Sequence, residues 1–403
     1  MPKTLIDVTS PSPTRKLSLL LDLPIEIQIE IIELLQDDWR TRPMGQRHPH
    51  PLKSLRLTCK QLESLCNPVF ANFIFIGSSL DRPELELRNE LASKFAKYLK
   101  RVIFFISGLQ EAKELFMESV LTAILDGAVH LRKLSIIYLR TDTGAHNQLL
   151  SAISRLGTLE DVKIWELEYP LFSPPDGTIE LTFNHRLLNH ILDYHSQRLR
   201  VLVVSSGTPM LESTFLKLRD TASQLRHLEL NQCLTIETRG AFTDPQIWAC
   251  ADRLEDLSIL RCAIRPATIV RHVGAGVFGP LRTLYILRCG DDSGDPPEPA
   301  AAIWTIPPLN WVHVDQFNDR EMDSLRSIHA KKVFMRRVWS GRPLCIEAFR
   351  KSTTFPEVAE LHVEKGWDDK DFEELKRSCA MRGLTMVKRD LEDKGSVRSR
   401  GSL

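Results

Sequence analysis

A short apolar motif recurs in the middle of the chain, and its copies begin 29 and 27 residues apart. Each copy has leucine at position 1, apolar residues at positions 4 and 6, and cysteine at position 9. The copies are Leu225-x-x-Leu228-x-Leu230-x-x-Cys233, Leu254-x-x-Leu257-x-Ile259-x-x-Cys262 and Leu281-x-x-Leu284-x-Ile286-x-x-Cys289. Cysteine makes up only 8 of 403 residues, so three cysteines at one chosen position arise by chance about once in 10⁵ trials. This part of the chain is therefore built from repeated units.

Weaker copies of the motif flank these three. Those upstream are Leu99/Val102/Phe104, Leu131/Leu134/Ile136, Leu159/Val162/Ile164 and Leu199/Leu202/Val204. Those downstream become more degenerate and are Leu309/Val312/Val314, Ala330/Val333/Met335, Val358/Leu361/Val363 and Met381/Leu384/Met386. Helix-like segments lie between the copies, at Asn147–Leu156, His185–His195, Leu211–Thr221 and Phe372–Ala380. The pattern is that of a leucine-rich repeat in which each unit contains a strand, a loop and a helix.

The physics of such a unit determines the architecture. One strand and one helix cannot bury their apolar faces alone, so the units must stack. Stacked strands lie about 4.8 Å apart, whereas packed helices need about 8–10 Å, so the array curves with its strands on the inside. We therefore predict an α/β fold in which a curved leucine-rich-repeat solenoid spans residues 99–388. It should carry roughly eight to ten parallel strands on its concave face.

The side chains that alternate with the core positions should face the concave side. A parallel sheet covered on both faces is apolar throughout, whereas these strands alternate leucines with polar and aromatic residues. Trp, Tyr and Arg dominate binding hot spots, so we expect a protein partner to bind on this face. The candidate residues are Tyr138, Trp165, His227, Glu229, Arg261, Tyr285, Arg288, Trp311, His313, Asp315, Phe334 and Arg336.

Two alternatives to this surface remain open. Any solenoid exposes some aromatic residues, and Trp165 could pack under the proline-rich insertion Tyr169–Gly177. A second insertion, the acidic segment Gly290–Ala300, could instead carry the recognition. Both insertions are expected to be loops at an edge of the array.

Residues 19–76 do not follow the repeat. Asp22 and Pro24 suit the cap and first turn of a helix whose apolar face continues through Ile27, Ile31, Leu34 and Leu35. A second helix should run to Pro68, with apolar residues at helical spacing at Leu52, Leu55, Cys59, Leu62, Leu65 and Cys66. An all-helical unit of only about 55 residues has too little core to stand well alone. Its surplus apolar surface should be covered by something else.

The residues of this unit also carry a resemblance. Leu23-Pro24-x-Glu26-Ile27-x-x-x-Ile31-x-x-x-Leu35, followed by Leu52-x-x-Leu55-Arg56-Leu57-Thr58-Cys59-Lys60-x-Leu62-x-x-Leu65-x-x-Pro68, resembles an F-box. With the repeats behind it, the chain resembles the F-box, leucine-rich-repeat proteins, although its connector Asp37–Pro51 is longer than usual in that family. The alternative is an amphipathic helical hairpin packed on the first repeat.

The resemblance implies a function. The helices would dock on a Skp-family adaptor that links the chain to a cullin–RING ubiquitin ligase, and the repeats would recruit a protein substrate. An interaction scaffold without a role in ubiquitin transfer is the alternative. The residues expected at or beneath the adaptor interface are Leu23, Pro24, Ile27, Ile31, Leu55, Cys59 and Leu65.

Composition excludes several other classes of protein. The net charge of +1 argues against a nucleic-acid binder. No apolar run approaches the roughly 20 residues of a membrane-spanning helix. The 8 cysteines form no Cys-x-x-Cys pair, which favours the reducing cytoplasm or nucleus. The tails 1–18 and 389–403 are expected to be disordered, and residues 77–98 should form a connecting helix.

No motif indicates chemistry. Gly274–Gly279 matches Gly-x-Gly-x-x-Gly, but a helix-like run precedes it and a strand follows, the reverse of a dinucleotide site. His185, His190 and His195 do not share one helix face, so we expect no metal site there. No set of nucleophile, base and orienting residue is recognisable. The sequence therefore predicts a protein without cofactor or catalytic site.

Overall fold

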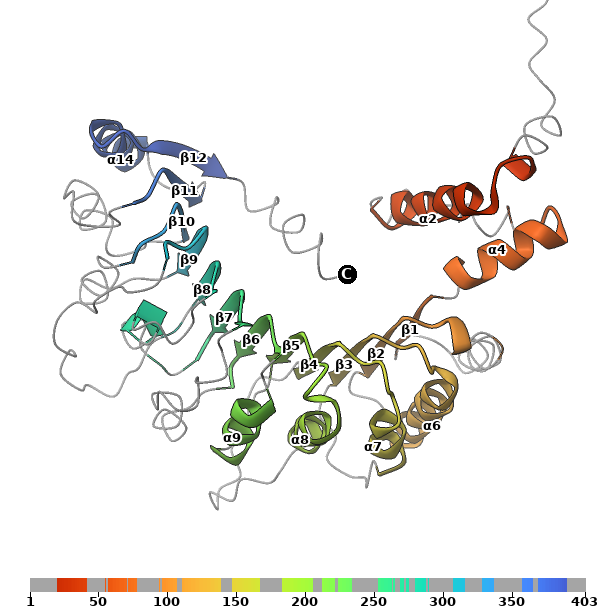
Figure 1. The fold of residues 1–403 in the computed structure, drawn as a ribbon. Coiled ribbons are helices and arrows are strands. Elements are labelled where there is room, and N and C mark those ends of the chain that lie inside the picture. Colours follow the sequence, from red (N-terminus) through yellow and green to blue (C-terminus); the bar gives the residue numbers. More distant parts are fainter. Residues whose placement is uncertain are drawn as a thin grey trace, which may run out of the picture.

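The computed structural model describes 20–41, 55, 57–70, 72–77, 94, 96–106, 111–138, 147–166, 183–205, 212–221, 224–233, 253–262, 264, 269–271, 273–274, 280–287, 289, 307–315, 328–336, 357–364 and 369–389. Its fold is α/β, with one open, all-parallel sheet of 12 strands in chain order. The sheet lines the inner side of an arc and the helices between the first strands cover its outer side (Figure 1). This arrangement fits a curved repeat solenoid.

The strands are short and evenly spaced along the chain. They are β1 Phe73–Gly77, β2 Arg101–Ile106, β3 Lys133–Tyr138, β4 Asp161–Glu166, β5 Val201–Ser205, β6 His227–Asn231, β7 Asp256–Leu260, β8 Thr283–Leu287, β9 Trp311–Asp315, β10 Lys332–Arg336, β11 Glu360–Glu364 and β12 Thr385–Arg389. The helices are α2 Ile25–Thr41, α4 Lys60–Phe70, the 3₁₀ helix η2 Ala96–Tyr98, α6 Glu111–Gly127, α7 Asn147–Ser154, α8 Phe183–His195, α9 Glu212–Thr221 and α14 Asp369–Met381.

The register of the sheet confirms the predicted repeat. Leu228 of β6 lies opposite Leu257 of β7, which lies opposite Leu284 of β8. These position-4 residues are buried, as are Leu230 and Ile259 at position 6. One continuous apolar core runs along the array from β1 to α14. Each unit therefore buries its apolar face against its neighbours, as stacking requires.

The cysteines at position 9 have a structural role. Cys233 Sγ lies 3.2 Å from the carbonyl oxygen of Val204, and Cys289 Sγ lies 3.3 Å from that of Ile259. Both carbonyls belong to position 6 of the preceding strand. The residues Gln232 and Arg261, at position 8, have positive φ values of 58° and 51°, which turn the chain out of the strand just before a cysteine. A small buried thiol can thus donate a weak hydrogen bond across the turn.

The sheet is longer than the sequence predicted. It has 12 strands rather than roughly eight to ten, because β1 adds a strand at its start and all of the degenerate downstream copies form strands. Strand β1 pairs with β2, with Ile74 opposite Val102, although its residues were expected to belong to the N-terminal helical unit. The segment fits a degenerate copy of the motif, with Ala71, Ile74 and Ile76 at positions 1, 4 and 6, but it had been assigned to the helical unit.

The register of the last unit differs from the prediction. Met386 lies opposite Leu361 and therefore occupies position 4, where Leu384 was expected. Both residues are apolar and two apart, and a shift of two residues keeps every side chain on the same face of a strand. Lys388 consequently occupies core position 6, where its Nζ lies 4.4 Å from the ring centroid of Phe372 in α14. The array thus ends on a charged residue over an aromatic ring.

Helices α2 and α4 pack on each other and form a separate small core. Ile32, Cys66 and Val69 are its buried centre, and Leu35, Leu55 and Leu65 pack against them. The apolar face predicted for α2 is correct only in part. Leu35 packs against the small core and Ile31 is half-buried, whereas Ile27 and Leu34 are exposed. The buried side is centred on Gln28 and Ile32. Gln28 Nε2 donates to the Leu23 carbonyl at 2.7 Å, which fixes the start of the helix.

The second helix also begins and ends later than expected. Helix α4 starts at Lys60 and continues past Pro68 to Phe70. The thiol of Cys59 accepts the backbone N–H of Leu62 at 3.5 Å and so caps the first turn. Most of the expected connecting helix 77–98 lies outside the described residues, as do residues 1–18 and 390–403 of the expected tails. Arg389, placed in the C-terminal tail by the sequence, instead ends strand β12.

Candidate functional site

Five aromatic rings gather on the concave side of strands β8 to β11. The ring of His313 lies 4.3 Å from that of Phe334, edge to face, and 5.5 Å from that of Tyr285. The ring of Trp311 lies 4.9 Å from that of His362 and 6.4 Å from that of Phe334. We call this group the aromatic cluster; it consists of Tyr285, Trp311, His313, Phe334 and His362.

The register of the sheet builds the aromatic cluster. Tyr285 pairs with His313, His313 with Phe334, and Phe334 with His362, so position 5 is aromatic on four successive strands. Neighbouring parallel strands lie about 4.8 Å apart, which is a suitable spacing for ring contacts. Trp311 joins the row from position 3 of β9. The repeat spacing alone therefore brings these side chains together.

The side chains of the aromatic cluster differ in solvent exposure, and two are buried beneath the other three. Phe334 and His362 are only 4% and 3% exposed, so they support their neighbours rather than offer contact area. Tyr285, Trp311 and His313 are half-buried and keep part of their rings at the surface. His362 was missed by the sequence prediction, although it occupies the same position 5 in a degenerate repeat.

A carboxylate that pairs with two basic side chains lies beside the aromatic cluster. Glu360 of β11 accepts a hydrogen bond from Lys332 Nζ at 3.0 Å and one from His362 Nε2 at 3.0 Å. These two hydrogen bonds, the larger from Lys332, hold the pKa of the Glu360 carboxyl below its ordinary value. The ionised carboxylate in turn holds the His362 ring under Trp311.

The other end of the concave face is charged rather than aromatic. Lys163, at position 5 of β4, has its pKa lowered chiefly by burial, while Asp161 opposes that shift. Asp161 also lies 3.6 Å from Lys133 Nζ across β3 and β4. The concave face therefore changes in character along the array, from ionic at β2–β4 to aromatic at β8–β11.

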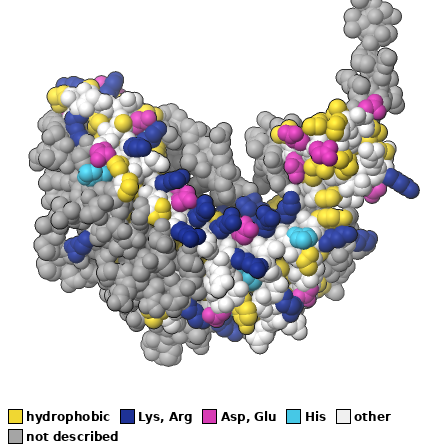
Figure 2. Space-filling view, viewed as in Figure 1, with side chains coloured by type: hydrophobic (Ala, Val, Ile, Leu, Met, Phe, Trp, Pro, Cys, Tyr) yellow, Lys and Arg dark blue, Asp and Glu magenta, His cyan; other side chains and the backbone are white. Residues whose placement is uncertain are grey.

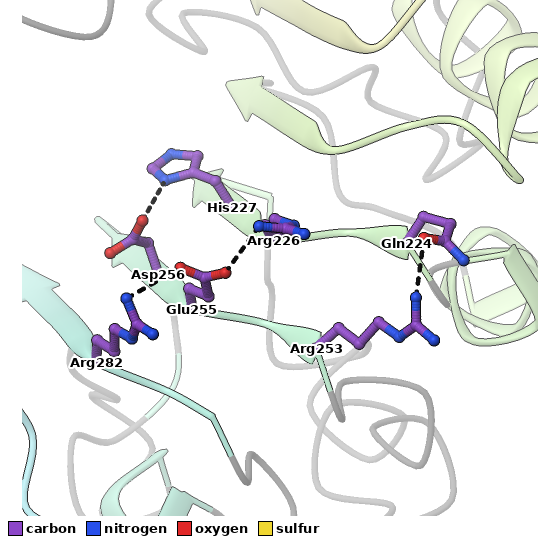
Figure 3. A network of polar contacts seen from close by, with 7 residues as sticks. All are labelled: Gln224, Arg226, His227, Arg253, Glu255, Asp256 and Arg282. Carbon is purple, nitrogen blue, oxygen red and sulfur yellow. Dashed lines mark hydrogen bonds and ion pairs between the residues drawn. The ribbon is translucent and has the colours of Figure 1, made fainter.

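A network of ion pairs crosses the starts of β6, β7 and β8 (Figure 3). Arg226 and Arg282 lie on either side of Glu255, at 3.2 and 3.6 Å. His227 Nδ1 lies 3.8 Å from Asp256. Burial of Asp256 opposes its ionisation, but hydrogen bonds from His227 and Thr283 bring its pKa below the ordinary value.

The remaining residues predicted for the concave face are scattered. His227 is engaged with Asp256 at the edge of the sheet, and Glu229 is half-buried at position 5 of β6. Trp165 is exposed at the end of β4, and Arg261 is exposed just after β7. Arg288 lies outside the described residues. For Tyr138, Asp315 and Arg336, the structure describes only the backbone, which lies in β3, β9 and β10.

Exposed apolar side chains concentrate in the N-terminal helices. Of ten large hydrophobic residues described as exposed, six belong to α2, its approach and the turn before α4; these are Leu23, Ile25, Ile27, Ile29, Leu34 and Leu57. Figure 2 shows the resulting apolar area over α2 and α4. Leu34 and Leu57 are 62% and 77% exposed. Helix α2 has an exposed acidic stripe at Glu26, Glu30 and Glu33, and apolar side chains over most of its remaining surface, more than the small core covers.

The residues predicted for adaptor binding fall into two groups. Leu23, Pro24 and Ile27 are exposed. Ile31, Leu55, Cys59 and Leu65 are half-buried, and two of them, Leu55 and Leu65, pack on the small core between the helices. The sequence prediction missed Ile25, Ile29, Leu34 and Leu57, which their placement beside the motif could have indicated.

Comparisons with known proteins leave the family of the chain open. No protein-family model matches the chain, and no curated protein is significantly similar to it. None of the helices in the described ranges has the length and apolar character needed to cross a bilayer. In the same part of the chain, no three His, Cys, Asp or Glu residues are grouped so as to hold a metal ion.

Proposed function

We propose that this chain is a non-catalytic substrate-recognition subunit of a Skp–cullin–F-box ubiquitin ligase. Residues 20–70 act as the F-box that binds a Skp-family adaptor, and the repeats hold a protein substrate on their concave face. Such a receptor works by positioning, because holding a substrate lysine near the charged conjugating enzyme raises their effective concentration. The proposal places the chain in the cytoplasm or nucleus.

The observation that carries the adaptor half is the apolar surface of α2. Exposed apolar area is unfavourable by about 25 cal/mol per Å², and monomers rarely gather so much of it in one place. The side chains Ile25, Ile29 and Leu34 lie on the sides of α2 that the small core does not cover. A partner that covers them would remove this cost. The motif resemblance identifies that partner as a Skp-family adaptor.

The aromatic cluster supports the substrate half. Tyr285 and Trp311 keep exposed ring area on a rigid sheet, above the buried rings of Phe334 and His362. Side chains held in this way lose little conformational entropy on binding, which favours them as hot spots. Substrate recognition is therefore proposed at β8–β11 rather than along the whole concave face.

Co-precipitation tests the adaptor half. The full chain carrying Leu23→Ala with Pro24→Ala is mixed with a purified Skp-family adaptor and its cullin partner. A central apolar side chain contributes about 2 kcal/mol or more, which is roughly thirtyfold in affinity, so capture should be lost. The control, Tyr194→Ala with Met381→Ala, removes apolar side chains of the solenoid that are even more exposed than Leu23 and should bind normally. Adaptor binding that survives the first pair of changes contradicts the docking claim.

Affinity capture tests the substrate half. Tyr285→Ala with Trp311→Ala should retain the adaptor and lose the proteins captured during proteasome inhibition. Tyr194→Ala, on the outer helix α8, is the control and should capture them all. An unchanged set of captured proteins would move recognition to another surface, first of all the Gly290–Ala300 segment. Captured proteins that never acquire ubiquitin would instead support the scaffold alternative.

A further inference from the structure

A polar depression lies at the edge of the sheet where strands β3, β4 and β5 begin. Its volume is about 330 Å³, and its walls include Arg132, Arg198 and Arg200 together with Glu160, Gln197 and Gln224. We call it the arginine pocket. It belongs neither to the concave face nor to the N-terminal helices, so the proposed function leaves it unexplained.

Backbone register brings the arginines to one place. The Glu160 N–H donates to the Arg132 carbonyl at 2.9 Å, and the Arg200 N–H donates to the Glu160 carbonyl at 2.8 Å. These three residues therefore occupy the same step of adjacent strands, with Arg132 and Arg200 about 10 Å apart at the backbone. Arg198 comes from the turn after α8, where its N–H bonds the His195 carbonyl at 3.0 Å.

The arginines of this pocket differ from those of the neighbouring repeats. Arg226 and Arg282 share the carboxylate of Glu255, and Arg155 pairs with Asp126. Within the described chain, by contrast, no ion pair or side-chain hydrogen bond neutralises Arg132, Arg198 or Arg200. Three guanidinium groups and one carboxylate leave an excess of two positive charges in the pocket.

The walls of the arginine pocket indicate what kind of ligand it takes. Every lining residue is polar or glycine, and each is exposed or half-buried. Sites for small metabolites are mostly apolar and enclosed, so this open depression fits a charged group presented by a larger molecule. Guanidinium forks match carboxylate and phosphate oxygens, and a phosphate monoester carries about −1.5 to −2 charges at pH 7. Its charge balances the excess in the pocket.

We propose that the arginine pocket binds the phosphate of a phosphorylated serine or threonine side chain in a partner protein. Arg132 and Arg200 clamp the phosphate from two strands, Arg198 contacts it from the end of α8, and the Gln197 amide supplies a neutral donor. Glu160 between the two strand arginines disfavours a ligand of higher charge density. This chemistry is independent of adaptor docking, because the pocket lies in the repeats.

Binding to the full chain without adaptor tests the proposal. The probes are inorganic phosphate, phosphoserine peptide in a neutral sequence, and the same peptide with serine, all at constant ionic strength. Thermal stability and fluorescence anisotropy should show saturable binding of the two phosphate probes and none of the serine peptide. Competition between phosphate and phosphopeptide is expected. Phosphate binding without phosphopeptide competition would overturn the assignment to a phosphorylated protein.

Three variants make the result specific. Arg132→Gln with Arg200→Gln should weaken phosphopeptide binding about tenfold or more. Arg226→Gln with Arg282→Gln removes the same charge from the neutralised pairs and should leave binding unchanged. Glu160→Gln should tighten binding severalfold, an outcome that a purely structural role would not produce. Equal loss in both arginine pairs, or no gain from Glu160→Gln, contradicts the proposal.

Discussion

The repeats bury their apolar side chains, whereas the N-terminal helices leave several of theirs exposed. In the repeats, leucines at positions 1, 4 and 6 are buried against the next unit, as Leu254, Leu257 and Ile259 are. In the N-terminal pair, the small core around Ile32 and Cys66 uses only part of the apolar surface of α2. The described repeats thus bury their apolar side chains, whereas the helical pair leaves several of its own exposed.

The difference follows from stacking. A strand in the middle of the array has neighbours on both sides, so every apolar side chain that points inward finds cover. Among the described residues, α2 and α4 pack chiefly on each other. Their excess apolar side chains therefore remain at the surface and mark the place where another protein should pack.

The largest effect should come from the centre of the array. Leu257→Ala removes a fully buried side chain that lies between Leu228 and Leu284 of the neighbouring strands. Such changes reduce the free energy of unfolding by about 2–5 kcal/mol. Denaturant unfolding followed by circular dichroism measures it. A loss well below that range would mean that the repeats are less tightly stacked than their register indicates.

A smaller, local effect is expected in the helical pair. Ile32→Ala creates a cavity in the small core and should reduce the free energy of unfolding by about 2 kcal/mol. This value is at the lower end of the usual range because so small a core can rearrange to fill the cavity. Limited proteolysis should then cleave within residues 20–70 while the repeats keep their unfolding midpoint. A parallel shift of both regions would show that the two cores unfold together.

Acid should weaken the repeats through His195. Its ring is buried, its Nε2 lies 2.8 Å from the Ile153 carbonyl, and burial lowers its pKa below the usual 6.5. The folded state therefore favours the neutral ring. Stability is complete above pH 6.5 and decreases as the pH falls from there toward the lower folded-state pKa. His195→Gln should flatten the pH dependence of the unfolding midpoint in this window; an unchanged slope would assign it to other groups.

The smallest effect should follow from Leu34→Ala. This side chain is 62% exposed, so its loss should change the free energy of unfolding by less than about 0.5 kcal/mol. Adaptor binding measured by calorimetry should nevertheless weaken. A lower free energy of unfolding with unchanged adaptor binding would show that Leu34 stabilises the helical pair and does not contact the adaptor.

Much of the repeat architecture could be predicted because the repeated spacing has one physical cause. Leu228, Leu257 and Leu284 had to meet on adjacent strands once the interval and the core position were known. The same arithmetic placed Tyr285, His313 and Phe334 side by side. Strand β1 was missed because its residues were assigned to the N-terminal helical unit. The register of the last unit was misread because Leu384 and Met386 lie on the same face of a strand.

Other features could not be derived from spacing. Apolar residues occupy every side of α2 except the acidic stripe of Glu26, Glu30 and Glu33, so periodicity alone cannot choose its buried side. The packing of Ile32 with Cys66 and Val69 shows which side is buried. The arginine pocket combines one step of three strands with the turn after α8. No linear motif spans such a set, and only the folded register makes its residues neighbours.

The lysine at the end of the array has a consequence for self-association. In every inner strand, position 6 offers an apolar side chain on which a further unit could stack, but β12 presents Lys388 over Phe372 instead. Parallel strands with unpaired edges invite addition of another chain, and an edge lysine opposes it because its charge would have to be buried. Lys388 therefore disfavours the stacking of a further apolar unit, or of a second copy, at this end of the described sheet.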